Sequence, residues 1–180
     1  MERTLHLGEY GEHLWTRDRA RDIRVEIVRM LNESSEGDLV SIDAKGVEVF
    51  DYSFANELFG KTLLNLSREY PGRFVIVENL TAYTAENLTK ALESLNLAMI
   101  HRKGKRLELI GKVHPTDANT FAAIAKARSP VTAAELKDAL GTNLTAMNER
   151  LSKLTGLALI RRQKAVSAAG REQYQYTVLN

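Results

Sequence analysis

The side chains best suited to chemistry lie close together near the C-terminus, between Gly141 and Arg171. Threonine, asparagine and serine side chains predominate at the start, and four arginines and two lysines lie from residue 150 onward. Such groups donate hydrogen bonds to phosphate oxygens, and asparagine, arginine and glutamate also recognise base edges. We expect phosphate oxygens and base edges to be the targets of Thr142, Asn143, Thr145, Asn148, Glu149, Arg150, Ser152, Lys153, Arg161, Arg162, Lys164 and Arg171.

The elements that must position these side chains are short and well marked. Thr132 and Glu135 form a capping box, in which a hydroxyl and a carboxylate satisfy free amides at a helix start. Gly141 turns the chain into a further helix, which Thr142 or Asn143 would cap. The predicted elements are helices over 118–125, 132–140 and 143–155 and strands over 157–162 and 174–179, with a polar loop over 163–173.

The helix over 143–155 is predicted to bury one apolar face. The inward side chains, at helical spacing, are Leu144, Met147, Leu151 and Leu154. The exposed face then holds Thr145, Ala146, Glu149, Ser152 and Lys153, flanked by Asn148 and Arg150. Glu149 would repel phosphates, so it fits a DNA interface only if it accepts a hydrogen bond from a cytosine amino group or points away.

The order of these elements resembles that of winged helix-turn-helix transcription regulators. The resemblance covers about residues 115–180, and its quoted pieces are Val131–Leu136, Leu140–Asn143, Leu151–Leu154 and Leu159–Arg162. It implies that the helix after Gly141 enters the major groove and that the following two strands, the wing, contact phosphates or a minor groove. Many such modules instead mediate dimerisation or protein docking, so a protein-only role stays open.

The N-terminal part alternates strands with helices, a pattern that predicts an α/β layer with some parallel pairing. Helices are predicted over 16–33, from 51–53 to before Pro71, and from Thr84 onward, and strands over 4–7, 39–43, 73–77, 98–102 and 106–110. Lys103-Gly104-Lys105 is predicted to be a hairpin turn between the last two strands. The predicted domains are residues 1–112 and 113–180.

Several pieces of the N-terminal part resemble STAS-like domains of the type called DUF4325. The main piece is Asp38–Gly60, and Thr16–Ala20 and Ile76–Asn79 match further parts of the pattern. The resemblance extends over about residues 2–112 and implies a mixed sheet with helices and a regulatory role.

Ser53 takes the place of a phosphorylatable serine found in the related anti-sigma-factor antagonists. It follows Asp51 by two residues at a predicted helix start. A phosphate there would gain from free amides and the helix dipole, and would add about −1.5 to −2 charge to a docking surface. Tyr52 and Phe54 replace the small neighbours usual in that family. The alternative is that Ser53 only caps the helix.

Composition and spacing argue against several classes of function. A content of 44% hydrophobic and 27% charged residues predicts a soluble globular protein, and no apolar run reaches the length of a membrane helix. The absence of cysteine excludes thiol catalysis and fits a reducing cytoplasm. The four histidines lack metal-ligand spacing, and no nucleotide loop or nucleophile–base pair is recognisable. We therefore expect no enzymatic activity, no metal and no cofactor.

Charge is unevenly distributed along the chain. Of the net charge of +2, residues 113–180 contribute +4 and residues 1–112 contribute −2, which favours nucleic-acid binding at the C-terminal end. We expect a cytoplasmic transcription regulator that binds duplex DNA as a homodimer, with a STAS-like domain for sensing or docking. The alternative is a partner-switching protein whose winged helix binds protein and whose partner is a histidine-kinase-like ATPase. A third alternative is a nucleotide or lipid ligand for the STAS-like domain.

Overall fold

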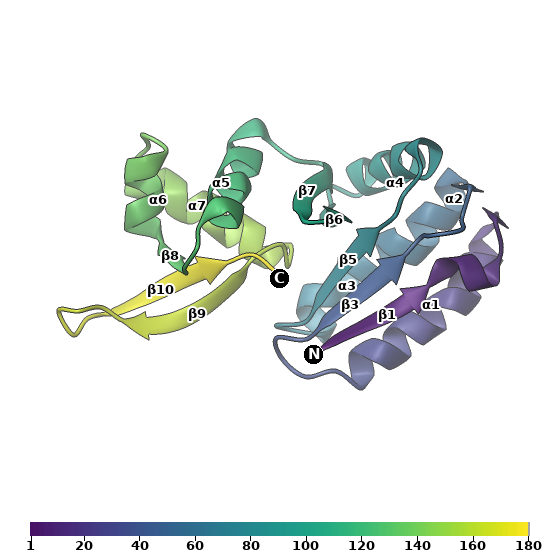
Figure 1. Cartoon of the computed structure of the whole chain (residues 1–180), viewed down its shortest axis with the longest axis horizontal. Helices are drawn as coiled ribbons and strands as arrows, with labels where there is room; N and C mark the ends of the chain where they lie inside the picture. The colour runs from purple at the N-terminus through teal and green to yellow at the C-terminus, as the bar shows by residue number, and fades with distance from the viewer. Residues whose placement is uncertain (180) are drawn as a thin grey trace. The chain divides into compact units, whose positions relative to one another are not determined.

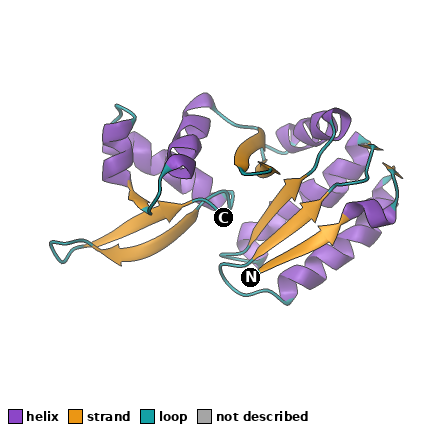
Figure 2. Ribbon diagram, viewed as in Figure 1, coloured by secondary structure: helices purple, strands orange, loops and turns teal. Residues whose placement is uncertain are grey.

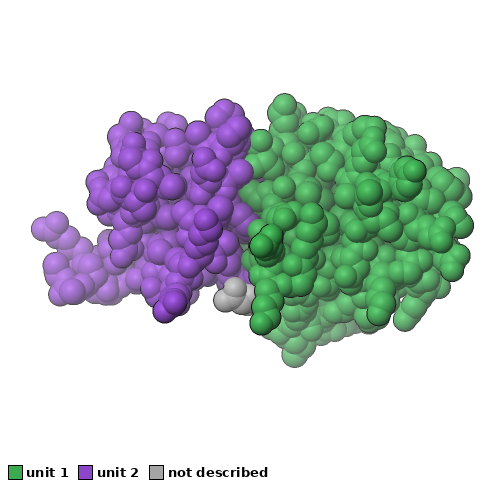
Figure 3. All heavy atoms as spheres, turned by 45° about the horizontal axis from the view of Figure 1, so that its top comes forward, with its two compact units in different colours: residues 1–113 green, residues 114–180 purple. Residues whose placement is uncertain are grey.

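The computed structural model describes residues 1–179. The chain divides into two compact units, Met1–Val113 and His114–Asn180, which Figure 3 colours green and purple. Each unit has its own sheet and its own buried apolar residues. Within residues 1–179, no helix is long and apolar enough to cross a membrane.

The first unit is built on a five-stranded sheet in the order β1-β3-β5-β6-β7. The strands are β1 (Glu2–His6), β3 (Leu39–Asp43), β5 (Phe74–Glu78), β6 (Ala98–Lys103) and β7 (Arg106–Gly111). The first four run parallel and β7 returns antiparallel to β6. The predicted α/β class with a mixed sheet is therefore confirmed.

The helices of this unit connect neighbouring parallel strands. They are α1 (Arg17–Asn32), α2 (Tyr52–Ala55), α3 (Lys61–Glu69) and α4 (Ala82–Ser94), with one π-helical turn, Asn56–Gly60, between α2 and α3. Right-handed crossovers that always step in the same direction place their helices on one face of a sheet. Figures 1 and 2 show α1, α2 and α3 behind β1, β3 and β5. The opposite face, which we call the helix-free face, carries no helix of this unit.

Buried aromatic side chains fill the space between the sheet and these helices. Phe50, Phe54 and Phe59 are almost fully buried, and the Phe50 ring lies 5.7 Å from that of Phe54 and 5.6 Å from that of Phe59, between centroids. A short parallel pair, β2 (His13–Leu14) with β4 (Val49–Phe50), and a 3₁₀ turn, Leu7–Tyr10, lie at the carboxyl ends of the parallel strands.

Gly111 ends β7 at a place where other residues would be strained. Its φ is +99°, and a Cβ there would lie 2.5 Å from the Leu97 carbonyl oxygen. Only glycine combines this backbone conformation with so close an approach. The glycine therefore lets the chain leave the sheet directly after β7.

The second unit contains three helices and a three-stranded sheet in the order β8-β10-β9. The elements are α5 (Pro115–Lys126), β8 (Val131–Thr132), α6 (Ala133–Ala139), α7 (Leu144–Gly156), β9 (Arg161–Val166) and β10 (Glu172–Thr177). Figure 1 shows the β9–β10 ribbon extending beyond the helices of its own unit. Buried side chains from all three helices form its core, namely Phe121, Ile124, Leu136, Met147, Leu151 and Leu154.

The strand bounds in this unit correct the sequence-based prediction. The strands predicted over 157–162 and 174–179 lie at Arg161–Val166 and Glu172–Thr177. Leu159 and Ile160 are buried as core residues before β9 begins, and Ala158 has a φ of +54°. Apolar side chains that pack beneath a turn give the same local pattern as a buried strand, so periodicity placed the strand too early.

Candidate nucleic-acid interface

Side-chain caps fix the geometry between α6 and α7. The Glu135 Oε2 atom accepts hydrogen bonds from the Thr132 amide at 2.7 Å and the Thr132 hydroxyl at 2.8 Å, which completes the predicted capping box. These bonds lower the pKa of Glu135 below its usual value. Asn143 Oδ1 accepts from the Ala146 amide at 2.8 Å, so Asn143 is the cap of α7. Its side-chain NH₂ remains able to donate to an outside acceptor.

The outward face of α7 carries neutral hydrogen-bonding groups, one carboxylate and one lysine. Met147, Leu151 and Leu154 are buried as predicted. The exposed side chains are Thr145, Asn148, Glu149, Ser152 and Lys153, while Ala146 and Arg150 are half-buried. Thr142 in the preceding turn is also half-buried. The negative charge of Glu149 thus stands among groups suited to base edges and phosphates.

Leu144 corrects the predicted apolar face of α7, because its side chain is 46% exposed. It is the first residue of the helix, directly after the cap at Asn143. Helical side chains lean toward the helix N-terminus, so the side chain of a first residue projects past the end of the packed surface. The helical spacing of apolar residues therefore does not predict that the side chain of the first residue is exposed.

Lys153 is exposed but forms an ion pair within its own unit. Its Nζ lies 2.6 Å from Asp117 Oδ2 on α5, and the Asp117 side chain is only 8% exposed. The ammonium therefore neutralises a buried carboxylate and joins α5 to α7. Lys153 was predicted as a DNA contact and Asp117 had no predicted role, because no local sequence pattern links the two residues.

The arginines of the β9–β10 ribbon lie on opposite faces of its two strands. Alternation along the strands and the pairing of Lys164 with Tyr174 place Arg162, Lys164 and Tyr174 on one face and Arg161 on the other. Arg162 and Lys164 are exposed, whereas Arg161 is half-buried. The Arg162 guanidinium lies 4.6 Å from the centre of the Tyr174 ring, a cation–π contact that orients it.

The cationic face of the ribbon is turned toward the helices of its own unit. Tyr176 lies on this face, opposite Arg162, and is buried at the base of the ribbon. At the far end, residues 167–171 form a closed turn, in which the Ser167 amide donates to the Arg171 carbonyl at 2.8 Å. Arg171 is exposed there. Arg162, Lys164 and Arg171 are hereafter the wing cations.

Ser53 lies in the first turn of α2 but does not cap it. Asp51 Oδ1 accepts from the Phe54 amide at 2.7 Å and is the cap, which leaves Ser53 half-buried two residues further along. The capping alternative considered for Ser53 therefore applies to Asp51. Asn56 and Glu57 follow Ser53 by three and four residues, the spacing that shares one helical face.

Three arginines of α1 surround Glu57 near Ser53. Glu57 is 5% exposed, and its Oε1 atom accepts from Arg24 Nη2 at 3.0 Å. Arg21 Nε and Arg17 Nη1 lie 3.8 Å and 4.0 Å from the same carboxylate. Arg21 also pairs with Asp18 at 3.1 Å, so three positive charges meet two negative ones, and the side chains of Arg17 and Arg21 are about half exposed.

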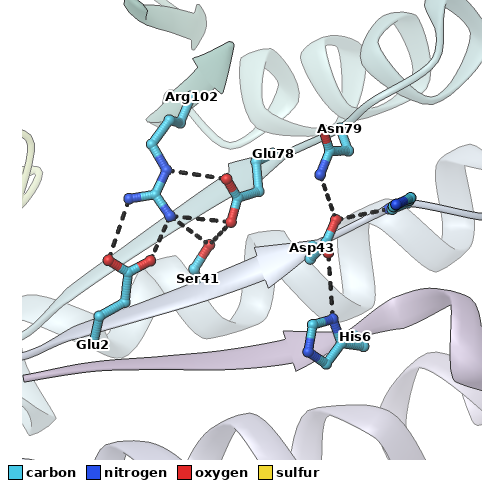
Figure 4. Close-up of polar contacts among 8 residues, drawn as sticks. Glu2, His6, Ser41, Asp43, Glu78, Asn79 and Arg102 are labelled. Atoms are coloured by element: carbon cyan, nitrogen blue, oxygen red, sulfur yellow. Dashed lines mark hydrogen bonds and ion pairs between the residues drawn. The ribbon is translucent and has the colours of Figure 1, made fainter. Parts of the chain in front are cut away.

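A second polar cluster crosses the helix-free face of the sheet (Figure 4). Arg102 on β6 donates to Glu78 Oε1 and Oε2 at 3.0 Å and reaches Glu2 on β1. The Ser41 hydroxyl on β3 donates to Glu78 at 2.6 Å. The hydrogen bonds from Arg102 hold the pKa of Glu78 below its usual value, against the effect of burial. We call these four residues the Arg102 cluster.

Asp43 forms a neighbouring set of contacts at the carboxyl end of β3 (Figure 4). Burial would raise the pKa of Asp43, but hydrogen bonds from Asn79 Nδ2 at 2.7 Å and from the Lys45 amide at 2.9 Å outweigh it and lower the pKa. His6 Nδ1 lies 3.3 Å from its other oxygen. Asp43 and Asp51 thus have separate partners.

Neither cluster was predicted, although β3 and β5 each end in a carboxylate, which was the only local signal. Within residues 1–179, no group of three or more His, Cys, Asp or Glu side chains is arranged to hold a metal ion.

No protein-family model matches the chain, and no curated protein matches it.

Proposed function

We propose that this chain is a DNA-binding transcription regulator of the winged helix-turn-helix kind. One observation carries the proposal. The same unit contains a helix, α7, that is capped by Asn143 and has an exposed polar face, and a β-ribbon that bears the three wing cations. The order α5-β8-α6-α7-β9-β10 and the sheet order β8-β10-β9 agree with the resemblance found in the sequence.

The distribution of charge suggests different roles for the β9–β10 ribbon and for α7. Lys153 is occupied by Asp117, so the outward face of α7 offers little attraction for phosphates. Phosphate attraction comes from Arg162, Lys164 and Arg171 instead. Asn148 and Glu149 on α7 are suited to adenine and to the cytosine amino group. On this proposal, the wing supplies affinity and α7 supplies sequence preference.

The STAS-like unit would carry the regulatory input. A half-buried Ser53 beside an arginine-rich face also supports the second candidate, a partner-switching protein whose winged helix binds protein. That candidate predicts transfer of phosphate to Ser53 by a histidine-kinase-like ATPase, lost in Ser53→Ala, and no affinity for duplex DNA.

Salt-dependent titration of the full chain with a mixed-sequence duplex tests the first proposal. The slope of log K against log salt falls by about 0.9 for each phosphate contact that is removed. We expect Arg162→Ala/Lys164→Ala to reduce the slope by about two such contacts. Lys61→Ala, which removes an exposed cation from α3, should leave it unchanged.

Two results would contradict the proposal. One is no measurable binding of the wild-type chain at low salt. The other is the same loss of affinity per removed charge in the Lys61→Ala control and in the wing variant, because binding would then reflect net charge alone. Glu149→Gln should alter the preferred sequence in a selection from random duplexes while keeping the salt slope.

A further inference from the structure

β7 forms one edge of the five-stranded sheet, and its outer side has no strand beside it. Its pairing with β6 joins Lys103 to Arg106 and His101 to Glu108, and the Lys112 amide donates to the Leu97 carbonyl at 2.7 Å. These pairs fix the phase of the antiparallel ladder, in which alternate residues point their backbone groups away from the partner strand.

Leu107 and Leu109 are the residues whose N–H and C=O groups point outward from β7. Among residues 1–179, neither has a backbone partner on that side. A row of unpaired backbone groups is a template for another strand. Natural edges are commonly blunted by proline, by lysine or by a bulge, and residues 106–110 contain none of these.

The opposite edge of the sheet is less suited to pairing. Leu5 is the one apolar side chain of β1, whose other residues are Glu2, Arg3, Thr4 and His6. Charged and polar side chains of this kind protect an edge from a second strand. β7 instead combines Leu107, Leu109 and Ile110 with one positive and one negative charge.

The two charges of β7 are complementary to a second copy of the same strand. Arg106 and Glu108 lie on the same face, which is the face of β6 that carries Lys103, and Leu107 and Leu109 lie on the helix-free face. An antiparallel pair centred on Leu107 places Arg106 opposite Glu108 of the partner subunit, twice by symmetry. Centring it on Glu108 would oppose two carboxylates, which is unfavourable.

We infer that two copies of this chain pair through the free edge of β7, antiparallel, with Leu107 on the twofold axis. The two sheets then continue into each other, joined by backbone hydrogen bonds from Leu107 and by the two Arg106–Glu108 pairs. The interface is isologous, as a twofold dimer requires. It uses only residues 1–113 and does not depend on DNA binding.

Sedimentation velocity of the full chain without DNA, over a range of protein concentrations, tests the pairing. Arg106→Glu places two glutamates opposite each other at both ends of the interface and should weaken dimerisation by about tenfold or more. Arg106→Glu/Glu108→Arg restores opposite charges and should recover most of the affinity. Lys45→Glu makes the same charge change away from β7 and should have no effect.

Single cysteines test the register, because the chain has none of its own. Leu107→Cys should form a disulfide-linked dimer under mild oxidation, since the two copies of residue 107 face each other within the Cα–Cα range of a disulfide. Leu109→Cys should not, because it would face Lys105 of the partner subunit. Circular dichroism of each variant checks that it is folded.

Each contrary result would contradict one part of the proposed dimer. A wild-type chain that is monomeric at every concentration overturns the dimer. A dimer unaffected by Arg106→Glu, or cross-linking at residue 109 in place of 107, overturns the β7 interface or its register. Because none of these measurements contains DNA, they fail or succeed separately from the titration with duplex.

Discussion

At the residue scale, the ion pair between Lys153 and Asp117 joins α5 to α7 in the second unit. The Asp117 carboxylate is buried and the Lys153 ammonium covers it at 2.6 Å, while about half of the lysine side chain stays in solvent. A buried carboxylate that loses its partner is destabilising, and solvent access to the lysine moderates the cost.

We predict that Lys153→Met lowers the free energy of unfolding of the second unit by about 1–2 kcal/mol, because Asp117 is left without its hydrogen-bond donor. Chemical denaturation followed by circular dichroism measures this. Lys164→Met is the matched control, since Lys164 is exposed on the ribbon and should weaken DNA binding without changing stability. The reverse pattern would make Lys153 a DNA contact after all.

The Arg102 cluster acts at the scale of elements, because it joins β1, β3, β5 and β6 across the helix-free face. The pKa of Glu78 is lower in the folded chain than in the unfolded chain, mainly because Arg102 donates to it. A carboxyl group with a lowered folded pKa stabilises the fold above its unfolded pKa and loses that contribution as pH falls through its folded pKa.

We therefore predict that Glu78→Gln is less stable than wild type at pH 7 and that the difference shrinks below about pH 4.3, the ordinary range of a glutamate. Thermal unfolding at a series of pH values measures the difference. Glu93→Gln, on the exposed side of α4, should follow the wild-type profile. A difference between Glu78→Gln and wild type that does not change with pH would show that the ion pair adds nothing beyond a neutral hydrogen bond.

At the scale of the whole molecule, the two units have separate buried cores. Phe50, Phe54 and Phe59 belong to the first, and Phe121 and Met147 belong to the second. Strand pairing also stays within each unit, since the sheets do not mix strands from both. A unit with its own core and its own hydrogen-bonded sheet meets the main conditions for folding alone.

We expect residues 1–113 and 114–180, produced separately, each to unfold in one cooperative transition. Heteronuclear NMR spectra should show dispersed signals for both fragments. The 114–180 fragment should keep the DNA salt slope of a single winged unit, and the 1–113 fragment should keep the β7 dimer. Loss of structure in either fragment would show that its core needs the other unit.

Local features were determined by the sequence alone, because each depends on residues within a few positions of each other. The Thr132–Glu135 capping box joins residues three apart, and backbone geometry brings any such pair together at a helix start. The buried strands β3 and β5 and the hairpin between β6 and β7 were likewise visible as apolar runs and a glycine turn.

The partners of Lys153, Glu78 and Arg102 were decided only by the tertiary structure. Lys153 meets a residue 36 positions away, and Arg102 meets Glu2 at a separation of 100. Such contacts depend on the order of strands in a sheet and on how helices cross, which hydrophobic periodicity does not encode. The free edge of β7 belongs to the same class, because a strand is an edge only once the order of its sheet is known.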